Sequence, residues 1–320
     1  MSLQHALIAI LADGEFHSGT ALGQQLDVSR NAVWKALQHL QGLDIDVHAV
    51  HGKGYRLTEP LELLDSQRIE SLLSEQSRNS LLSMDVLFDV DSTNAWLLRQ
   101  SRRHAVVCLA ERQHSGRGRR GRDWISPFAA NLYLSMGWKF EISASSLGSM
   151  SLVIGVAIVR GLQALGIEGL SLKWPNDIYC QGRKLGGILI EMRGESGGPS
   201  ELVIGVGINI HMPRSVDESI SQPWIDLRHC HGVSRNRVAA SVIDAVVEAC
   251  QRSSEGDTRQ YLDEWESLNE FAGASVAVHM PDGNIIEGRC TGIDENGALL
   301  LEHQGEIQHF HCGEVSLRGT

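Results

Sequence analysis

The chain of 320 residues lacks several features that would place it in a specialised class of proteins. It has only six cysteines, scattered without a paired spacing, which argues against a disulfide framework or a zinc site and favours reduced thiols in a cytoplasmic protein. Its longest apolar stretch, residues 147–159, stops at Arg160 and is too short to span a bilayer, so a buried helix is expected there. No basic segment opens the chain, so no signal peptide is expected.

Basic residues are also fewer than acidic ones. The 28 lysines and arginines face 39 acidic residues, and the net charge of −11 argues against a general binder of nucleic acid or acidic membranes. Any contact with a polyanion must therefore come from a local patch. The length exceeds one common domain and predicts two or three.

Against this acidic background, one segment concentrates positive charge between Arg112 and Trp124. Five arginines alternate there with three glycines: Arg112, Arg117, Arg119, Arg120 and Arg122 with Gly116, Gly118 and Gly121. The planar guanidinium group binds carboxylate or phosphate through paired hydrogen bonds, and glycines let backbone amides approach a ligand. The segment predicts an anion-binding loop. Taken alone, it also fits a disordered nucleic-acid-binding run or a solvated turn.

Residues 1–64 are predicted to form a winged helix-turn-helix domain. Three helices and a two-stranded hairpin are expected at residues 4–12, 20–26, 29–40, 47–51 and 55–57. Ser29 is a natural N-cap for the third helix, and the turn of the hairpin is formed by residues 52–54.

The third predicted helix has an apolar face and a polar face. Val33, Leu37 and Leu40 share one side at helical spacing. The opposite side and the hairpin turn supply the candidate DNA-binding residues: Arg30, Asn31, Trp34, Lys35, Gln38 and Lys53. Together with Arg56, the cations among these are the only basic residues of the domain, and such segregation suits a one-sided phosphate contact. A helical protein-interaction module is the alternative.

The remainder divides into two further parts, so the fold class is predicted to be multidomain α+β. Residues 65–270 alternate strands, expected at 84–90, 106–111, 131–138, 171–174, 184–192 and 202–210, with helices at 91–103, 149–165, 236–250 and 258–268. Residues 271–320 read as short strands at 275–279, 285–293, 298–303 and 306–310, joined by tight glycine turns. Such spacing is typical of a small β-barrel.

Five motifs follow one another within residues 65–270, namely Ser92-Thr93-Asn94, residues 116–122, Lys173-Trp174-Pro175-Asn176-Asp177, Lys184-Leu185-Gly186-Gly187 and Gly205-Val206-Gly207-Ile208-Asn209. With the flanking winged helix and barrel, they resemble the family of bifunctional biotin–protein ligases and biotin-operon repressors over nearly the whole chain. The resemblance implies a biotin/lipoate ligase-like central domain and an SH3-like C-terminal barrel.

The resemblance also implies an activity. Such an enzyme activates biotin with ATP to biotinyl-5′-AMP, then transfers biotin to a lysine of the biotin carboxyl carrier protein of acetyl-CoA carboxylase. The adenylate-bound homodimer represses the biotin operon by binding operator DNA. Mg²⁺ is implied by the ATP chemistry, and its ligands cannot be identified from the sequence.

Site residues follow from matching the family's motifs. Catalytic roles are implied for Lys184 and Arg119. Biotin is expected to contact Ser92, Thr93, Asn94, Gln113, Gly116, Arg117, Gly118, Arg119, Trp124, Lys184, Gly186 and Gly187. ATP and the adenylate are expected to contact Arg117, Arg119, Arg122, Lys173, Asn176, Asp177, Asn209 and Trp224, the last stacking on adenine from a mobile loop at residues 212–224. Gly186 stands where alanine is frequent and is expected to widen the pocket.

Simpler interpretations exist for some of these residues. Lys184 also fits a solvated turn, Ser92 to Asn94 fit helix capping, and Trp124 fits an ordinary core position. Two other functions share much of the pattern. A lipoate–protein ligase would use the same fold and anion chemistry, although its arginine-glycine motif differs and a winged helix is unexpected there. A ligand-sensing repressor without ligase activity would keep the same domains, although Lys184, Arg117 and Arg119 are intact.

Overall fold

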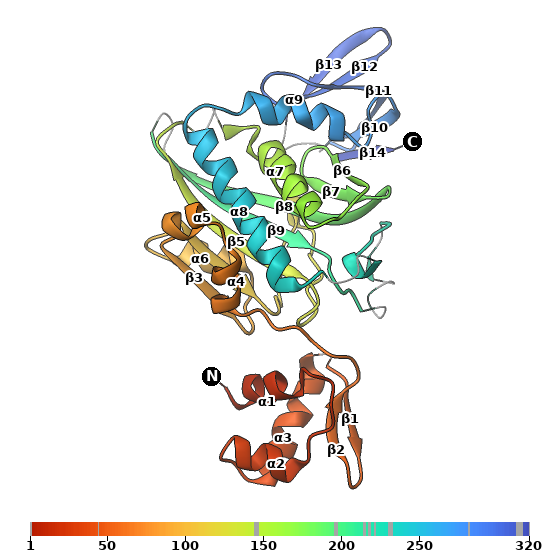
Figure 1. The fold of residues 1–320 in the computed structure, drawn as a ribbon. Helices are drawn as coiled ribbons and strands as arrows, with labels where there is room; N and C mark the ends of the chain where they lie inside the picture. The colour runs from red at the N-terminus through yellow and green to blue at the C-terminus, as the bar shows by residue number, and fades with distance from the viewer. Residues whose placement is uncertain are drawn as a thin grey trace.

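The computed structural model describes residues 2–43, 45–143, 147–194, 198–213, 216, 219–220, 222–229, 233–280, 282–311 and 316–319. Three parts follow one another along the long axis of the molecule (Figure 1). Helices and a small hairpin form one end, a large mixed sheet with helices forms the middle, and a second antiparallel sheet forms the other end. The predicted multidomain α+β class is confirmed.

The N-terminal part is a three-helix unit with a two-stranded wing. It contains α1 (Leu3–Leu11), α2 (Gly19–Gln25), α3 (Arg30–Leu40), the 3-10 turn η1 (Gln41–Leu43), β1 (Val47–Val50) and β2 (Gly54–Leu57). Ser29 caps α3, because its Oγ accepts a hydrogen bond from the backbone N–H of Ala32 at 3.1 Å. Val33, Leu37 and Leu40 are buried, as their spacing predicts. Burial of this stripe leaves the polar face of α3 toward solvent.

The central part is built on a seven-stranded sheet in the order β3-β4-β5-β9-β8-β7-β6. Its strands are β3 (Ser83–Leu87), β4 (Val106–Ala110), β5 (Leu132–Phe140), β6 (Leu170–Lys173), β7 (Asp177–Cys180), β8 (Arg183–Gly194) and β9 (Ser200–Ile208). Strands β3 and β4 run parallel, and the other neighbours are antiparallel. The order brings the ends of β8 and β9, which carry two of the motifs, side by side in the middle of the sheet.

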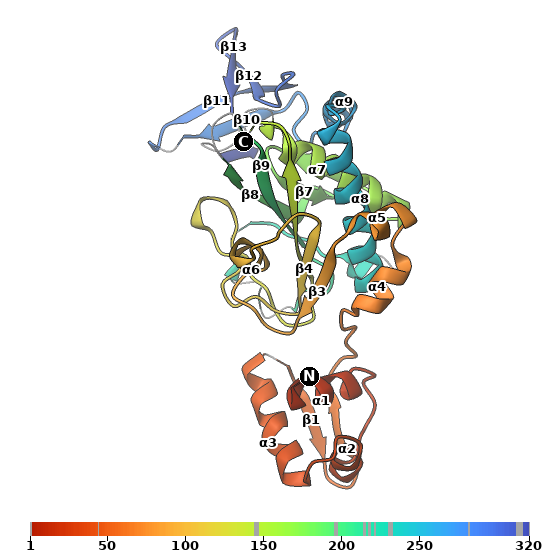
Figure 2. The same cartoon turned by 90° about the vertical axis from the view of Figure 1, so that its left-hand side faces the viewer.

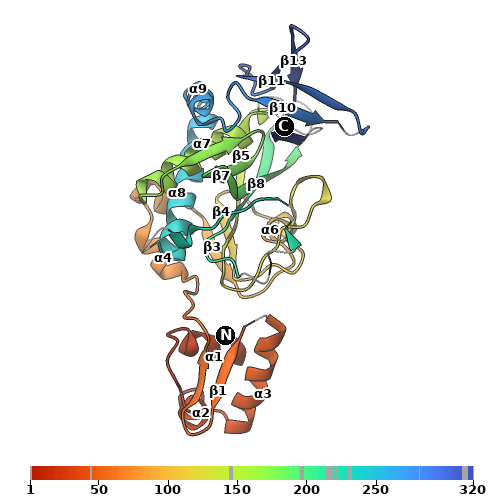
Figure 3. The same cartoon turned by 90° about the vertical axis from the view of Figure 1, so that its right-hand side faces the viewer.

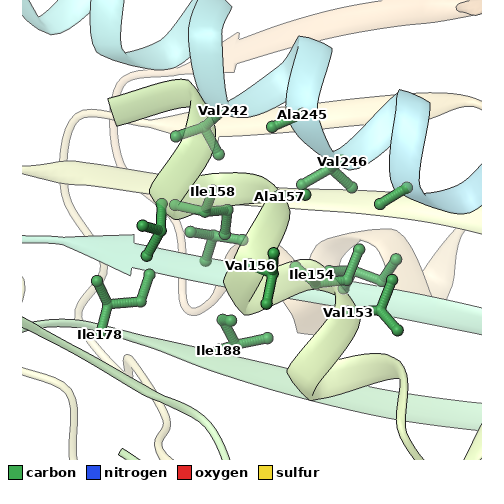
Figure 4. Close-up of a cluster of buried hydrophobic side chains, with 14 of the residues drawn as sticks. Val153, Ile154, Val156, Ala157, Ile158, Ile178, Ile188, Val242, Ala245 and Val246 are labelled. Atoms are coloured by element: carbon green, nitrogen blue, oxygen red, sulfur yellow. The ribbon is translucent and has the colours of Figure 1, made fainter. Parts of the chain in front are cut away.

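Helices cover both faces of this sheet (Figure 2 and Figure 3). On one face lie α7 (Met150–Ala164) and α8 (Arg235–Ser254), and on the other lies α6 (Thr93–Arg99). Alternation along β4 explains the division, since Val106 and Cys108 pack with α6 while Val107 and Leu109 join the core under α7 and α8. The apolar face of α7 lies against the sheet and α8 (Figure 4).

The C-terminal part follows α9 (Arg259–Leu268). Strands β10 (Ser275–His279), β11 (Ile285–Ile293), β12 (Leu299–His303), β13 (Glu306–Phe310) and β14 (Ser316–Gly319) form a sheet in the order β13-β12-β11-β10-β14. This part is anchored on the central one, because Trp174 Nε1 donates a hydrogen bond to the carbonyl of Gly297 at 3.1 Å.

Several elements differ from the expectations. Helices α4 (Ser66–Leu72) and α5 (Glu75–Ser80) and strands β7 and β14 were not predicted. The helix expected to reach residue 103 ends at Arg99, because Gln100 has extended backbone angles. Cys108, Cys180, Cys250 and Cys290 are buried thiols outside any disulfide, while Cys230 and Cys312 lie outside the described residues. Within the described ranges, the helices include none with the length and apolar character needed to cross a membrane.

The N-terminal part packs directly on the central part. The ring of His5 from α1 stacks on Phe88 with centroids 5.1 Å apart, and Phe88 in turn lies 4.9 Å from Phe128. Arg112, at the start of the arginine-rich segment, donates to the carbonyl of Gly42 at 3.3 Å. The winged unit therefore touches both ends of the segment that contains the arginine loop.

A buried ion pair secures the connection between the two parts. Glu111 and Arg235 are 2.7 Å apart, and both side chains are 2% exposed. Glu111 Oε1 also accepts from the backbone N–H of Leu64 at 2.6 Å, and Arg235 Nη1 donates to the carbonyl of Glu62 at 2.6 Å. These bonds attach residues 62–64, which connect the N-terminal part to the central part, to the end of β4 and the start of α8.

Candidate active site

All five motifs meet at one cavity of about 1240 Å³ in the central part. The arginine loop, the turn between β6 and β7, and the ends of β8 and β9 form its walls and floor. Its lining includes these residues expected to bind ligand: Ser92, Thr93, Asn94, Gln113, Arg117, Gly118, Arg119, Arg122, Trp124, Lys173, Asn176, Asp177, Lys184, Gly187, Asn209 and Trp224. The sequence therefore selects residues that the fold brings together from six separate segments.

Two of the expected residues do not line the cavity. A Cβ atom at Gly186 would lie 2.6 Å from the carbonyl oxygen of Gly207, against the neighbouring strand. The expectation that Gly186 widens the pocket is wrong, because side chains alternate along β8 and only Gly187 faces the cavity. Gly116 faces the backbone of Trp124 and the hydroxyl of Ser126.

The floor of the cavity is a patch of glycines on adjacent strands. Gly187 of β8 lies opposite Gly207 of β9, and Trp124 of the arginine loop packs over them. A Cβ atom at Gly207 would come within 2.5 Å of the Trp124 ring. The glycines thus permit a flat group to lie directly on the sheet, which is the close approach that the motif predicts.

Buried polar groups form one end of the cavity. The side chain of Ser92 caps α6, so the capping interpretation of this residue is correct. Gln113 Oε1 accepts from both the backbone N–H and the hydroxyl of Thr93, at 2.9 and 3.1 Å, and Gln113 Nε2 donates to Ser126 at 3.2 Å. The hydroxyl of Ser135, missed in the sequence, lies 2.7 Å from Thr93 Oγ1. Side chains with fixed donors and acceptors suit recognition of a polar ring.

Asn94 extends this cluster toward β8. Its Nδ2 donates to the carbonyl of Leu189 at 3.2 Å and to Glu191 Oε2 at 2.8 Å. Glu191 was not predicted as a site residue. A signal for it exists, since it is the one carboxylate in the run from Gly186 to Met192.

Two cations of the cavity come from different elements, β8 and the arginine loop, and each has a polar partner. Lys184 Nζ lies 2.7 Å from Asp177 Oδ1, with both side chains 15% exposed. On the loop, Arg119 Nη1 donates to Asn176 Oδ1 at 3.1 Å. Because Asn176 belongs to the turn between β6 and β7, this bond draws the arginine loop across the opening.

Lys173 lies in an aromatic setting. Its Nζ donates to the hydroxyl of Tyr179 at 3.2 Å and lies 5.4 Å from that ring and 6.0 Å from the ring of Phe271. Burial lowers the pKa of Lys173, and the carboxylate of Asp177 partly opposes this effect. Burial also raises the pKa of Tyr179 to about 12, so its hydroxyl stays protonated at neutral pH.

The C-terminal part completes the cavity with residues that no sequence pattern selects. Phe271, Leu317, Arg318 and Gly319 all line it. They carry no motif and lie far along the chain from the central strands, so only the folded arrangement identifies them.

The loop expected to hold Trp224 is described in part. Residues 214, 215, 217, 218 and 221 lie outside the described residues. Next to Trp224, Lys184 N–H donates to the carbonyl of Pro223 and Ile225 N–H donates to the carbonyl of Lys184, at 3.1 and 3.0 Å. Trp224 is therefore joined to the first residues of β8.

The described residues contain no group of three or more His, Cys, Asp or Glu side chains able to hold a metal ion.

The candidate DNA-binding residues lie at the far end of the molecule. The exposed ones on α3 and the wing are Arg30, Asn31, Trp34, Lys35, Gln38 and Lys53. Arg56 is half-buried, with its guanidinium 4.9 Å from the ring centroid of Phe16, and Lys53 Nζ lies 5.7 Å from the same centroid, so two of the four basic residues pack on one aromatic ring.

Comparison with known proteins matches three family models in chain order. Residues 3–56 match an HTH domain, residues 87–209 the biotin/lipoate A/B protein ligase family, and residues 273–318 the biotin protein ligase C terminal domain. The chain is 44% identical to the bifunctional ligase/repressor BirA of Salmonella typhimurium, covering 98% of this chain and 97% of that protein. Identity to the bifunctional ligase/repressor BirA of Escherichia coli is 43%, with the same coverage.

The fold resembles a solved structure with ligands. The biotin protein ligase from Aquifex aeolicus in complex with biotin and ATP aligns with a TM-score of 0.65 and 28% identity. The alignment covers 75% of this chain and all of that one.

Proposed function

The chain belongs to the family of bifunctional biotin protein ligase/repressors, and from that membership we propose that it biotinylates a carrier protein and represses transcription. It activates biotin with ATP to biotinyl-5′-AMP and then transfers biotin to a lysine. The observation that supports the ligase activity most strongly is the convergence of Lys184, Lys173 and the arginine loop on one cavity with a glycine floor.

Adenylation requires two anions to meet. The carboxylate of biotin attacks the α-phosphorus of ATP, an acyl–phosphate bond forms, and pyrophosphate leaves. Lys184 and Arg119, whose partners Asp177 and Asn176 are consecutive residues, neutralise the carboxylate and the phosphate as these come into contact. The fused rings of biotin lie against the ring of Trp124, which covers the floor at Gly187 and Gly207, and the cluster around Thr93 and Gln113 binds the ureido group.

Transfer requires no nucleophile from the enzyme. The ε-amine of a carrier lysine attacks the mixed anhydride, AMP leaves, and an amide forms. None of the described cysteines needs a covalent role; Cys108, for example, is buried under α6, and burial raises the pKa of its thiol, so it stays protonated. We propose the biotin carboxyl carrier protein of acetyl-CoA carboxylase as the acceptor and the cytoplasm as the compartment.

Magnesium is proposed as the companion of ATP. The described residues offer no acidic cluster for it. Mg²⁺ is commonly held by substrate phosphates with one or two carboxylates, so we expect it to enter with the nucleotide.

Repression is proposed to act through a dimer that forms when the adenylate is bound. Strand β7 pairs with β8 only as far as Gly187, while β8 continues to Gly194 along β9. Residues 189–194 therefore present a sheet edge, and such edges pair with other chains. Two copies joined there would place two winged helices on a palindromic operator.

One assay separates the proposal from its alternatives. The chain is incubated with ATP, a carrier domain, and either radiolabelled biotin or radiolabelled lipoate. We expect label from biotin alone on the carrier. Label from lipoate would indicate a lipoate–protein ligase, and biotin binding without transfer would indicate a sensor with no ligase activity.

A further inference from the structure

Glu191 joins the arginine loop to the polar end of the cavity. Its Oε2 accepts hydrogen bonds from Asn94 Nδ2 at 2.8 Å and from Arg117 Nη2 at 3.0 Å. Glu191 follows Gly187 and Leu189 on the same face of β8, because side chains alternate along a strand. A carboxylate therefore stands beside the floor and holds one of the cations expected to meet an anionic ligand.

Two cations that line the cavity, Lys184 and Arg117, form ion pairs that differ in exposure. Lys184 and Asp177 are both 15% exposed, whereas Arg117 is 45% and Glu191 27% exposed. Water and salt screen the second pair more strongly, so it is the weaker of the two. A ligand carboxylate or phosphate that approaches Arg117 inside the cavity can replace Glu191 at little cost.

We propose that Glu191 is a positioning residue that holds Arg117 in the ligand-free protein and releases it to the ligand. The carboxylate of Glu191 occupies the guanidinium until the biotin carboxylate or the adenylate phosphate takes its place. The identity of that anion rests on the proposed function, but the ligand-free contact does not. Arg119 stays bonded to Asn176, so the loop has a second attachment that Glu191 does not control.

The thermodynamic consequence has a definite sign. A contact made only in the ligand-free state stabilises that state, so its removal tightens ligand binding by the same free energy. For an exposed ion pair this corresponds to about a 1.4- to 5-fold lower dissociation constant. A contact kept in the bound state would give the opposite change. Glu191→Gln suits the test, because glutamine retains an oxygen to accept from Asn94 while losing the charge that holds Arg117.

The experiment measures two quantities on the full chain. Calorimetry gives the dissociation constant of biotin for the wild type, Glu191→Gln and Glu191→Asp. Hydrogen exchange of the ligand-free proteins follows the amides of Gly118 and Trp124, which donate within the loop to Arg122 and Gly116. Glu201→Gln is the matched control, since it removes a carboxylate on β9 that pairs with Arg103 and not with the loop.

Faster loop exchange in both Glu191 variants, with tighter biotin binding and no change in Glu201→Gln, is the expected result. Unchanged exchange, or weaker biotin binding by Glu191→Gln, overturns the proposal. The Glu191→Asp variant keeps the negative charge but shortens the side chain, which moves the carboxylate away from Arg117. It serves as the test if Glu191→Gln does not fold. A wild type that fails to bind biotin would refute the proposed function, while loop exchange would still decide the role of Glu191.

Discussion

Three of the cations that line the cavity, Lys184, Arg119 and Lys173, have partners of different chemical kinds. Lys184 faces a carboxylate, Arg119 an amide, and Lys173 a phenol and two aromatic rings. A cation already beside a carboxylate is held in place but partly neutralised. The electrostatic contribution of each to binding two anions will therefore differ, although all three come from motifs that look alike in charge.

Lys184 gives the sharpest test at this scale. Lys184→Ala removes the cation and leaves Asp177 facing the two reacting anions, so we expect adenylation to slow by about 10²-fold or more, a barrier increase of about 2.7 kcal/mol. Single-turnover formation of biotinyl adenylate measures the effect. Adding Asp177→Asn should recover part of the loss, and exposed Arg183→Ala serves as the control. Normal adenylation by Lys184→Ala would exclude the lysine from the reaction.

Lys173 predicts a dependence on pH. Burial lowers its pKa from the ordinary value of 10.5, so the charge is present below the lowered pKa and is lost as the pH rises through it. If this charge binds ATP phosphate, the KM for ATP should increase in the alkaline range at a pH below 10.5. Lys173→Arg stays charged there, so its KM should remain flat. Identical profiles for both proteins would argue that another group titrates.

The sequence identifies the motif residues of the site but not their partners. Lys184 and Asp177 lie in separate motifs, and no local pattern indicates that they pair. Glu191, Tyr179 and Phe271 carry no motif at all. Their contacts depend on the antiparallel register of β7, β8 and β9 and on the position of the C-terminal sheet, and both are set by long-range packing.

At the scale of elements, the arginine loop contacts other segments at two points, and we propose that it acts as a lid. Arg119 reaches Asn176 across the opening, and Trp124 lies on the glycine floor. Retention of a reactive intermediate depends on such contacts, whereas its formation depends on the charges beneath them.

Arg119→Gly separates these two roles. The loop would lose its bond to Asn176 and part of its grip on the adenylate, so activated biotin should escape and label lysines of bystander proteins. We expect off-target biotin on serum albumin to increase several-fold while adenylate is still formed. Arg183→Gly, at an exposed residue that does not line the cavity, is the control. Adenylate that forms and stays bound in the Arg119 variant would contradict the lid.

Elements with a strong apolar period were predicted well, and those without one were missed. Helix α7 buries a continuous stripe, whereas α5 buries only Ser77 and α4 only Ile69. Their N-caps, Asp65 and Ser74, were the available signals. Strand β14 is a short edge strand paired with β10 from forty residues earlier, a contact that no turn predicts.

At the scale of the whole molecule, the cavity is lined by the central and C-terminal parts, whereas α3 belongs to the N-terminal part at one end of the molecule (Figure 1). The predicted domain limits at residues 64 and 270 remain predictions. What the sequence could not supply is how the parts touch, because His5, Phe88 and Phe128 belong to no common motif.

Coupling between the two ends predicts ligand-dependent assembly. Biotin with ATP should shift the chain from monomer to dimer in sedimentation, with a coupling free energy of about 1 to 3 kcal/mol. Operator affinity should increase with it and fall steeply with added salt. Arg30→Ala and Lys35→Ala should weaken operator binding while leaving biotin transfer intact. Self-association that does not change with biotin and ATP would contradict this coupling. Normal operator binding by both variants would indicate a ligase whose winged helix does not act in repression through these residues.

The stack of His5 on Phe88 has a consequence for transplanting domains between relatives. A chimera that joins the winged helix of a relative to residues 65–320 would place a different α1 surface against Phe88. It would also change the contact between Arg112 and the Gly42 position. The first test of such a chimera is whether the foreign domain packs on residues 65–320, which can be measured as the thermal stability of those residues. Only chimeras in which residue 5 is chosen to pack on Phe88 would then measure the DNA-sequence specificity of the foreign winged helix.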